Sequence, residues 1–131
     1  MHSMRDYAIP VLRGGLVVLF LWFGLSQVID PSGWVAWVPE WPTALTGLSA
    51  ETIVLLNGLF EMILGVMLLL GIWTRYVALL LALHLFLVAF EVGYNDIGVR
   101  DFSLAVATLA LALWGDDRFS VLRFFKKTDS F

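Results

Sequence analysis

The sequence predicts an all-α membrane protein, a four-transmembrane-helix antiparallel bundle with both termini on the cytoplasmic side (N-in/C-in) and an interfacial Trp-rich outer loop. Three observations lead to this prediction. The composition is too apolar for a soluble domain of this length, and four apolar segments each have nearly the length of a membrane span. The basic residues also gather on one side of the predicted membrane.

Composition sets the first limits on fold and function. Of the 131 residues, 60% are hydrophobic and 15% are charged, whereas a soluble domain is about half apolar and about a quarter charged. The length fits a single membrane domain over residues 1–131. The net charge of −3 is modest and not clustered, which argues against nucleic acid as a partner. The sequence has no cysteine, which excludes disulfides, thiol redox chemistry and cysteine metal sites.

Four apolar segments are predicted to form membrane-spanning helices, over approximately 9–29, 52–73, 76–92 and 97–114. Each is close to the ~20 residues that a helix needs to cross the hydrocarbon core. The tail, residues 116–131, mixes phenylalanines with basic residues and is predicted to form a short helix at the membrane surface.

Helix-breaking residues separate these segments. The run Asp30-Pro31-Ser32-Gly33 ends the first segment, residues 71–75 form a short turn, and residues 93–96 precede the fourth segment. We expect Asp96 to be the N-cap of that last helix. The first segment is not interpreted as a cleaved signal peptide, because its apolar run is too long and no small-x-small cleavage site follows.

The distribution of basic residues predicts the orientation. With four crossings, seven of the eight Lys and Arg residues lie on the side of the termini, and only Arg100 lies on the other side. Because cytoplasmic loops are enriched in Lys and Arg, both termini are predicted to face the cytoplasm. The outer loop contains Trp34, Trp37 and Trp41, which are typical of the outer membrane interface.

Polar residues inside the predicted membrane indicate the interior face of each helix. Placing a charge at mid-helix costs roughly 2.5–3.5 kcal/mol on insertion scales. Helical spacing predicts four interior faces: Val17, Phe20, Gly24 and Gln27; Asn57, Glu61 and Gly65; His84, Val88, Glu91 and Asn95; and Asp101, Ala105, Thr108, Ala112 and Gly115. The last face consists mostly of small residues, which permits close helix approach.

Glu61 and His84 are predicted to form a pair near the membrane midplane. Both lie near the middle of their helices, and those helices are antiparallel neighbours joined by a short turn. Two interpretations remain open: a proton-handling site, or a structural pair that holds two helices together. For Asn57 and Gln27 the structural interpretation is favoured. Arg100 is expected either to pair with Asp101 or Asp96 as a structural ion pair, or to serve the site.

The predicted site is a polar column in the outer half of the bundle, and the inner half is expected to be nearly all apolar. The candidate intramembrane polar site comprises Glu61, His84, Asn57 and Glu91. The predicted outer mouth comprises Gln27, Tyr94, Asn95, Asp96, Arg100 and Asp101. Catalytic residues are not assigned, and no metal site is expected because His84 is the one histidine of the bundle.

These residues resemble a known family. The segment Asn57-Gly58-Leu59-Phe60-Glu61, followed by Gly65, Gly71 and Thr74-Arg75, resembles the DoxX family of small four-helix integral membrane proteins. Arg13 and Phe23-Gly24-Leu25-Ser26-Gln27 of the first helix also fit, although many relatives have a lysine where this chain has Gln27. The resemblance covers about residues 12 to 115. It implies a multi-pass protein of the prokaryotic cytoplasmic (cell) membrane.

Two classes of function follow from the resemblance and the polar residues. Some relatives are small subunits linked to thiosulfate:quinone oxidoreduction, which suggests a quinone- or redox-linked membrane subunit in which Glu61 and His84 handle protons. The alternative is a non-enzymatic membrane anchor, partner subunit or small carrier. The sequence has no recognisable motif for haem, flavin, nicotinamide or iron–sulfur. If redox chemistry occurs, a quinone, which the resemblance implies, or a partner subunit would have to supply it. Expected partners are membrane lipid and a protein partner subunit. Whether the chain is an enzyme, and its oligomeric state, are left open.

Overall fold

The protein is a bundle of long helices. The computed structural model describes residues 3–117, 119 and 120. Four helices of this part are long and apolar enough to cross a membrane: α1 (Arg5–Ile29), α3 (Ala50–Leu70), α4 (Thr74–Val92) and α5 (Asp96–Trp114). The four predicted segments are therefore confirmed, with boundaries that differ by a few residues. The orientation in the membrane remains a prediction, so we call the end with the α3–α4 turn the turn end and the opposite end the cover end.

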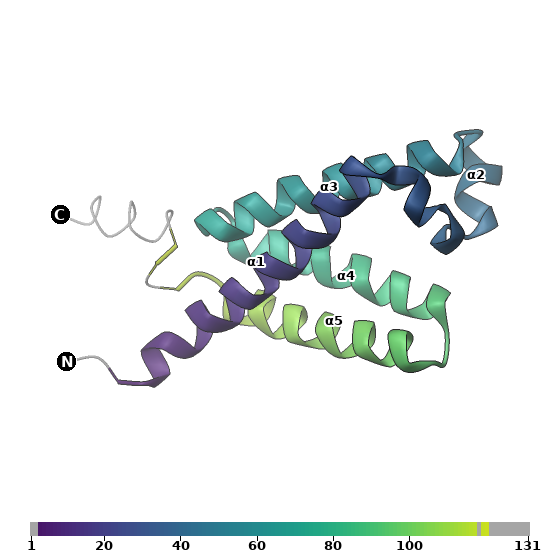
Figure 1. Ribbon diagram of the computed structural model, residues 1–131. Helices are drawn as coiled ribbons and strands as arrows, with labels where there is room; N and C mark the ends of the chain where they lie inside the picture. The colour runs from purple at the N-terminus through teal and green to yellow at the C-terminus, as the bar shows by residue number, and fades with distance from the viewer. Residues whose placement is uncertain (1–2, 118, 121–131) are drawn as a thin grey trace.

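The segment between α1 and α3 is folded into two short helices. A 3₁₀-helix, η1 (Pro31–Trp37), is followed by α2 (Glu40–Thr46). Asp30 starts η1, because its Oδ1 accepts hydrogen bonds from the amide of Gly33 at 3.3 Å and from Ser32 Oγ at 2.9 Å. This segment, residues 30–46, is the cover of the bundle. The predicted outer loop is thus a folded element at the cover end (Figure 1).

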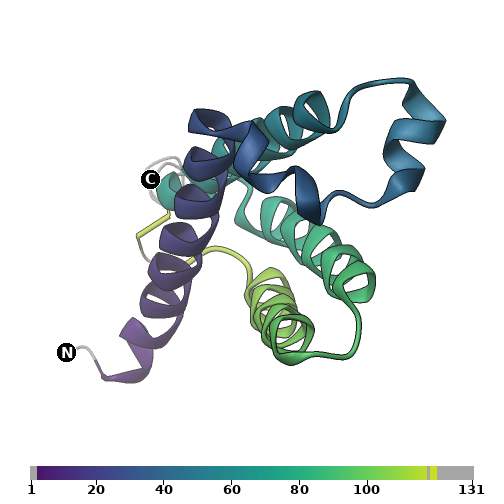
Figure 2. The ribbon, with the colours of Figure 1, turned by 45° about the vertical axis from the view of Figure 1, so that its right-hand side comes forward.

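The long helices pack as two pairs, α1 on α3 and α4 on α5 (Figures 1 and 2). Glycines bring the first pair together, since a Cβ atom on Gly24 would lie 2.9 Å from the carbonyl oxygen of Gly58. A Cβ atom on Gly58 would in turn lie 2.9 Å from the carbonyl oxygen of Gly24. Close helix approach was predicted for the small-residue face of α5. The glycine contact between α1 and α3 was not predicted.

Two connections reverse the chain direction. At the turn end, α3 stops at Gly71 with φ of 73° and α4 begins after Trp73 with φ of 48°. At the cover end, Asn95 caps α5 by accepting a hydrogen bond from the amide of Gly98 at 2.9 Å. The prediction of Asp96 as the N-cap was therefore wrong by one residue. Asp96 lies in the first turn of α5, where its negative charge interacts favourably with the positive end of the helix dipole.

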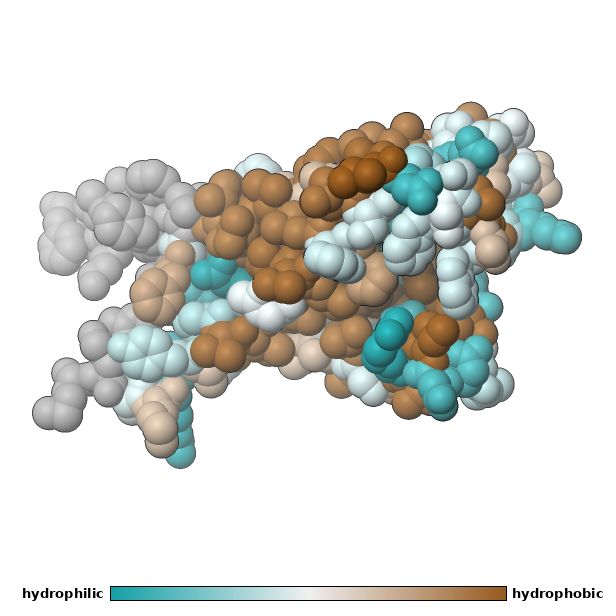
Figure 3. Space-filling view, viewed as in Figure 1, coloured by the Kyte–Doolittle hydropathy of each residue, from teal (hydrophilic) through white to brown (hydrophobic). Residues whose placement is uncertain are grey.

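The core lies on the predicted interior faces of α1, α3 and α5, but the face predicted for α4 was wrong. Because α4 packs mainly on α5, its buried residues are Thr74, Val77, Ala78, Leu81, Ala82, Leu85 and Ala89. On the predicted face of α4, His84 and Val88 are half-buried, and Glu91 and Asn95 are exposed. On α1 and α5 the predicted faces contain the buried residues Val17, Phe20, Gly24, Gln27, Ala105, Thr108 and Ala112. Leu68, Leu81 and Leu111 are fully buried between them. The outward faces remain exposed and apolar, and they form a broad hydrophobic surface over α1 and α3 (Figure 3). Such a surface is stable when lipid covers it.

The turn-end half of the bundle was expected to be nearly all apolar, but it contains a buried ion pair. Arg13 of α1 is only 6% exposed there and forms an ion pair with Asp117 at 2.7 Å. The chain after α5 causes the difference, because it folds back and buries Asp117 and Ser120 against the bundle. These two residues belong to the predicted surface tail. The rest of that tail, residue 118 and residues 121–131, lies outside the described residues.

Candidate functional site

Glu61 of α3 and His84 of α4 face each other in the middle of the bundle. Glu61 Oε1 lies 3.2 Å from His84 Nε2, and the carboxylate side chain is 7% exposed. The hairpin explains this contact, because α3 and α4 run antiparallel from one short turn and each residue lies at mid-helix. The predicted proximity of the two side chains is confirmed. Their role as a functional site remains a prediction.

An amide chain connects this pair to α1. Asn57 Nδ2 donates to Gln27 Oε1 at 2.7 Å and approaches Glu61 Oε1 at 3.5 Å. Gln27, Asn57, Glu61 and His84 therefore form one hydrogen-bonded row across three helices. Gln27 was expected at the outer mouth, but it is buried in this row. The row positions the carboxylate, because Glu61 contacts Asn57 of its own helix and His84 of α4, and Asn57 is in turn bonded to Gln27 of α1.

The second carboxylate oxygen of Glu61 is left without a partner. Among the described residues, Glu61 Oε2 is buried and makes no hydrogen bond. A buried polar atom without a partner costs about 1–3 kcal/mol, and more when it is charged. This oxygen can therefore accept a hydrogen bond from a bound molecule with a gain in free energy.

A cavity of about 950 Å³ lies between the two helix pairs, on the cover-end side of Glu61 and His84. Most of its wall is apolar and aromatic, including Phe20 and Phe23 of α1 and Phe60 of α3. Its polar lining residues are Gln27, Asn57, Glu61, His84, Glu91, Asn95, Arg100 and Asp101. A concave, mostly apolar site with a few converging polar groups is typical of small-molecule binding.

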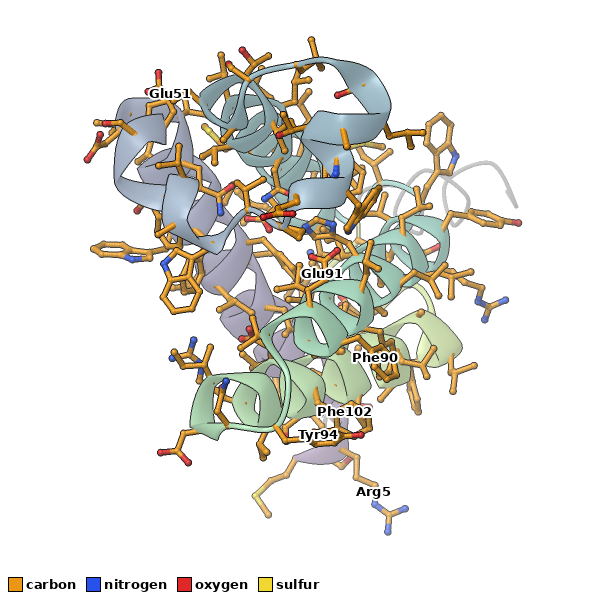
Figure 4. All side chains as sticks on the ribbon, turned by 90° about the vertical axis from the view of Figure 1, so that its right-hand side faces the viewer. Arg5, Glu51, Phe90, Glu91, Tyr94 and Phe102 are labelled. Atoms are coloured by element: carbon orange, nitrogen blue, oxygen red, sulfur yellow. The ribbon has the colours of Figure 1, made fainter. Side chains whose placement is uncertain are left out.

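The cover closes one side of this cavity with its tryptophans, since Trp34, Trp37 and Trp41 all line it. Trp34 packs edge-on against Phe23 with ring centroids 5.6 Å apart, which joins the cover to α1. Trp41 Nε1 donates to Glu91 Oε1 at 2.9 Å, which joins it to α4. Glu91 therefore contacts the cover and not His84, and Figure 4 shows it between α4 and the cover.

Of the remaining residues predicted at the mouth, some line the cavity and others do not. Of the two predicted acidic partners, Asp101 is the one that pairs with Arg100, at 3.6 Å. Both line the cavity together with Asn95. Tyr94 and Asp96 are exposed and do not line it.

The turn end holds a charged cluster that the sequence patterns had not indicated. Arg13 Nε and Nη2 donate to the two carboxylate oxygens of Asp117 at 2.7 and 3.2 Å. Arg13 Nη1 donates to the carbonyl oxygens of Leu68 and Leu69, at the end of α3, at 2.7 and 2.8 Å. A signal was present in the sequence, because Arg13 lies four residues before Val17 and so shares its buried face. Its positive charge on the side of the termini indicates orientation, and the structure gives it a buried structural role as well.

Comparison with known proteins identifies the family. Residues 8–93, more than half of the chain, match the family model of DoxX, a family of small membrane proteins. No curated protein and no solved structure shows significant similarity to the chain. Among the described residues, no group of three or more His, Cys, Asp or Glu side chains could hold a metal ion. The chain therefore belongs to the DoxX family and is a multi-pass membrane protein.

Proposed function

We propose that this member of the DoxX family is a subunit that binds a compound of the quinone class in its cavity and exchanges protons with it through Glu61 and His84. One observation carries the proposal: Glu61 Oε2 is buried without a partner beside His84, at the wall of an apolar cavity. An unpaired buried carboxylate is costly as a structural device. Ionisable residues within a membrane span are rare and usually mark a functional site, which supports this assignment.

The chemistry of a quinone fits this arrangement. Its ring is apolar and planar, which suits an aromatic wall, and its carbonyl oxygens accept hydrogen bonds. A protonated Glu61, or an N–H of His84, supplies a donor to such an oxygen. After reduction, the hydroquinone O–H becomes the donor and Glu61 Oε2 the acceptor. The same pair of side chains thus serves both forms of the compound.

The proton and electron balance requires a partner. Reducing a quinone to a hydroquinone consumes two electrons and two protons. Glu61 and His84 supply protons only, and the chain has no recognisable motif for an electron-carrying cofactor. We therefore place the electron source in a protein partner. The proposed location is the prokaryotic cytoplasmic membrane, with both termini in the cytoplasm, as the basic residues predict.

The test is quinone binding by purified protein, with Glu61→Gln compared with Glu51→Gln. The tryptophans of the cover lie at the cavity and report binding by fluorescence quenching. Glu51 is the matched control, because it lies exposed in the first turn of the same helix. We expect Glu61→Gln to weaken binding about tenfold or more, since hydrogen bonds to charged groups contribute about 1.5–3 kcal/mol. Glu51→Gln should bind like the wild type.

Proton exchange is tested by the pH dependence of the same binding. If Glu61 exchanges a proton with the bound compound, wild-type affinity should depend on pH, and Glu61→Gln affinity should depend on pH less. If the row Gln27–Asn57–Glu61–His84 only holds helices together, Glu61→Gln should lower the melting temperature and leave binding unchanged. That outcome would favour the alternative of a non-enzymatic anchor or carrier.

A further inference from the structure

The cavity reaches the surface of the bundle between α3 and α4. The α1–α3 contact is closed by its glycines, and α4 and α5 pack closely along their length. The cover lies over the cover end, and Leu68, Leu81 and Leu111 fill the core toward the turn end. Two gaps between helices remain, α3–α4 and α1–α5.

Exposure of the apolar lining residues distinguishes these two gaps. Leu56 and Phe60 of α3 and Leu87 of α4 line the cavity and are between 36% and 51% exposed. By contrast, the apolar lining residues that the described parts of α1 and α5 contribute are all buried or half-buried. The gap with exposed apolar walls is therefore α3–α4, whereas the exposed lining residue of α5 is the charged Arg100. We call Leu56, Phe60 and Leu87 the α3–α4 seam.

The seam leads directly to the polar pair. The ring of Phe60 packs on the imidazole of His84, with centroids 5.2 Å apart, and Phe60 is the neighbour of Glu61 in α3. One side of Phe60 thus faces the outside of the bundle and the other borders the polar pair. Both helices are membrane spans, and Glu61 and His84 lie at mid-helix. What lies outside the seam at this depth is hydrocarbon.

We propose that the ligand is a membrane-resident compound with a polar ring head and a long apolar tail, whose head lies at Glu61 and His84 and whose tail leaves through the α3–α4 seam. This inference rests on the proposed function and specifies its substrate class and route. A seam with apolar walls that opens into hydrocarbon accepts an alkyl or isoprenoid chain without desolvating any polar group. A polar, water-soluble ligand would instead enter past the exposed polar lining residues at the cover end, Glu91, Asn95 and Arg100.

The tail is expected to act on entry more than on affinity. Lipid chains are as apolar as the seam, so moving a tail from lipid into the seam gains little free energy. A tailed compound is held in the bilayer, however, and reaches the cavity only from the side. Narrowing the seam should therefore slow its association, whereas a small ring without a tail should be less affected.

The experiment compares Leu87→Phe with Leu80→Phe in lipid nanodiscs. Leu80 is the matched control: it lies two turns nearer the turn end on the same face of α4, is 50% exposed against 48% for Leu87, and does not line the cavity. The probes are a decyl-substituted benzoquinone and tetramethylbenzoquinone, which has no tail. Association is followed by stopped-flow quenching of tryptophan fluorescence. Leu56→Phe narrows the seam from the α3 side and serves if Leu87→Phe does not fold.

We expect Leu87→Phe and Leu56→Phe to slow association of the decyl compound about tenfold, the scale that overpacking produces. Leu80→Phe should match the wild type, and tetramethylbenzoquinone should bind all variants at similar rates. Equal rates for the decyl compound in Leu87→Phe, Leu56→Phe and Leu80→Phe would overturn the seam while leaving the proposed function in place. If neither compound binds the wild type, the proposed function fails and the seam inference fails with it.

Discussion

Removing the guanidinium of Arg13 should destabilise the protein more than removing any exposed basic side chain. Arg13→Met keeps a long apolar side chain on the buried face of α1 and deletes the charge. Asp117 Oδ1 then still accepts a hydrogen bond from the amide of Phe119 at 2.8 Å, but Asp117 loses both hydrogen bonds from Arg13. The carbonyl oxygen of Leu69 loses the donor that Arg13 supplies, whereas that of Leu68 still accepts from the amide of Gly71 at 3.2 Å.

The size of the effect follows from the burial of the ion pair. The side chains of Arg13 and Asp117 are 7% and 4% exposed, so solvent screens their interaction little. Breaking a buried pair by removing one partner typically costs about 3–5 kcal/mol, because the other charge stays buried. Replacing both partners with apolar residues removes that penalty. We therefore expect a loss of about 3–5 kcal/mol for Arg13→Met, and recovery to within about 1 kcal/mol of wild type for Arg13→Met combined with Asp117→Leu.

The measurement is the free energy of unfolding in detergent micelles, from denaturant titration of far-ultraviolet circular dichroism. Arg75→Met is the control, since Arg75 is exposed and its described bond, to the carbonyl oxygen of Trp114, is long at 3.4 Å. That variant should lose at most about 1 kcal/mol. The reasoning would be refuted if Arg13→Met and Arg75→Met had equal stability. A double variant that is no more stable than Arg13→Met alone would also contradict it.

Two further predictions concern helix packing and orientation. Gly58→Leu should reduce the free energy of unfolding by about 1–3 kcal/mol, because the new side chain meets the backbone of Gly24. Gly14→Leu, where a Cβ meets nothing within 4 Å, should be neutral or slightly stabilising in the same titration. For orientation, a cysteine that replaces Trp37 should react with an impermeant maleimide in intact cells, and one added at the N-terminus should not. Labelling of the N-terminal cysteine under those conditions would reverse the assigned topology.

Length and periodicity predicted the four spans and the interior faces of α1, α3 and α5, but not the buried face of α4, which packs mainly against α5. Each helix is amphipathic in the sense of a membrane protein, with polar or small residues on one face and lipid-facing apolar residues on the others. That pattern placed Glu61 opposite His84, because an antiparallel hairpin with a short turn leaves little freedom in depth. Local patterns of this kind can be read from one helix at a time.

The parts that were missed depend on contacts between distant segments. The Arg13–Asp117 ion pair joins residues 104 positions apart, and no local pattern shows that the chain after α5 folds back. Gln27 was expected at the mouth, but Asn57 of α3 buries it. Glu91 was grouped with His84 by helical spacing, yet Trp41 of the cover binds it. In each case a tertiary partner decided the position of a side chain that sequence spacing alone left undetermined.

The two ends of the bundle are held by interactions of different strength. At the turn end, Arg13 joins α1, α3 and the chain after α5 through four hydrogen bonds to Asp117 and the carbonyl oxygens of α3. At the cover end, the described contacts that hold the cover to α1 and α4 include one ring contact, from Trp34, and one exposed hydrogen bond, from Trp41. Local opening follows the regions with fewer buried contacts. The helix pairs should therefore separate at the cover end and pivot about the turn end. Such a motion widens the α3–α4 seam and leaves the Arg13 cluster intact, so exchange of a tailed ligand does not require the bundle to come apart.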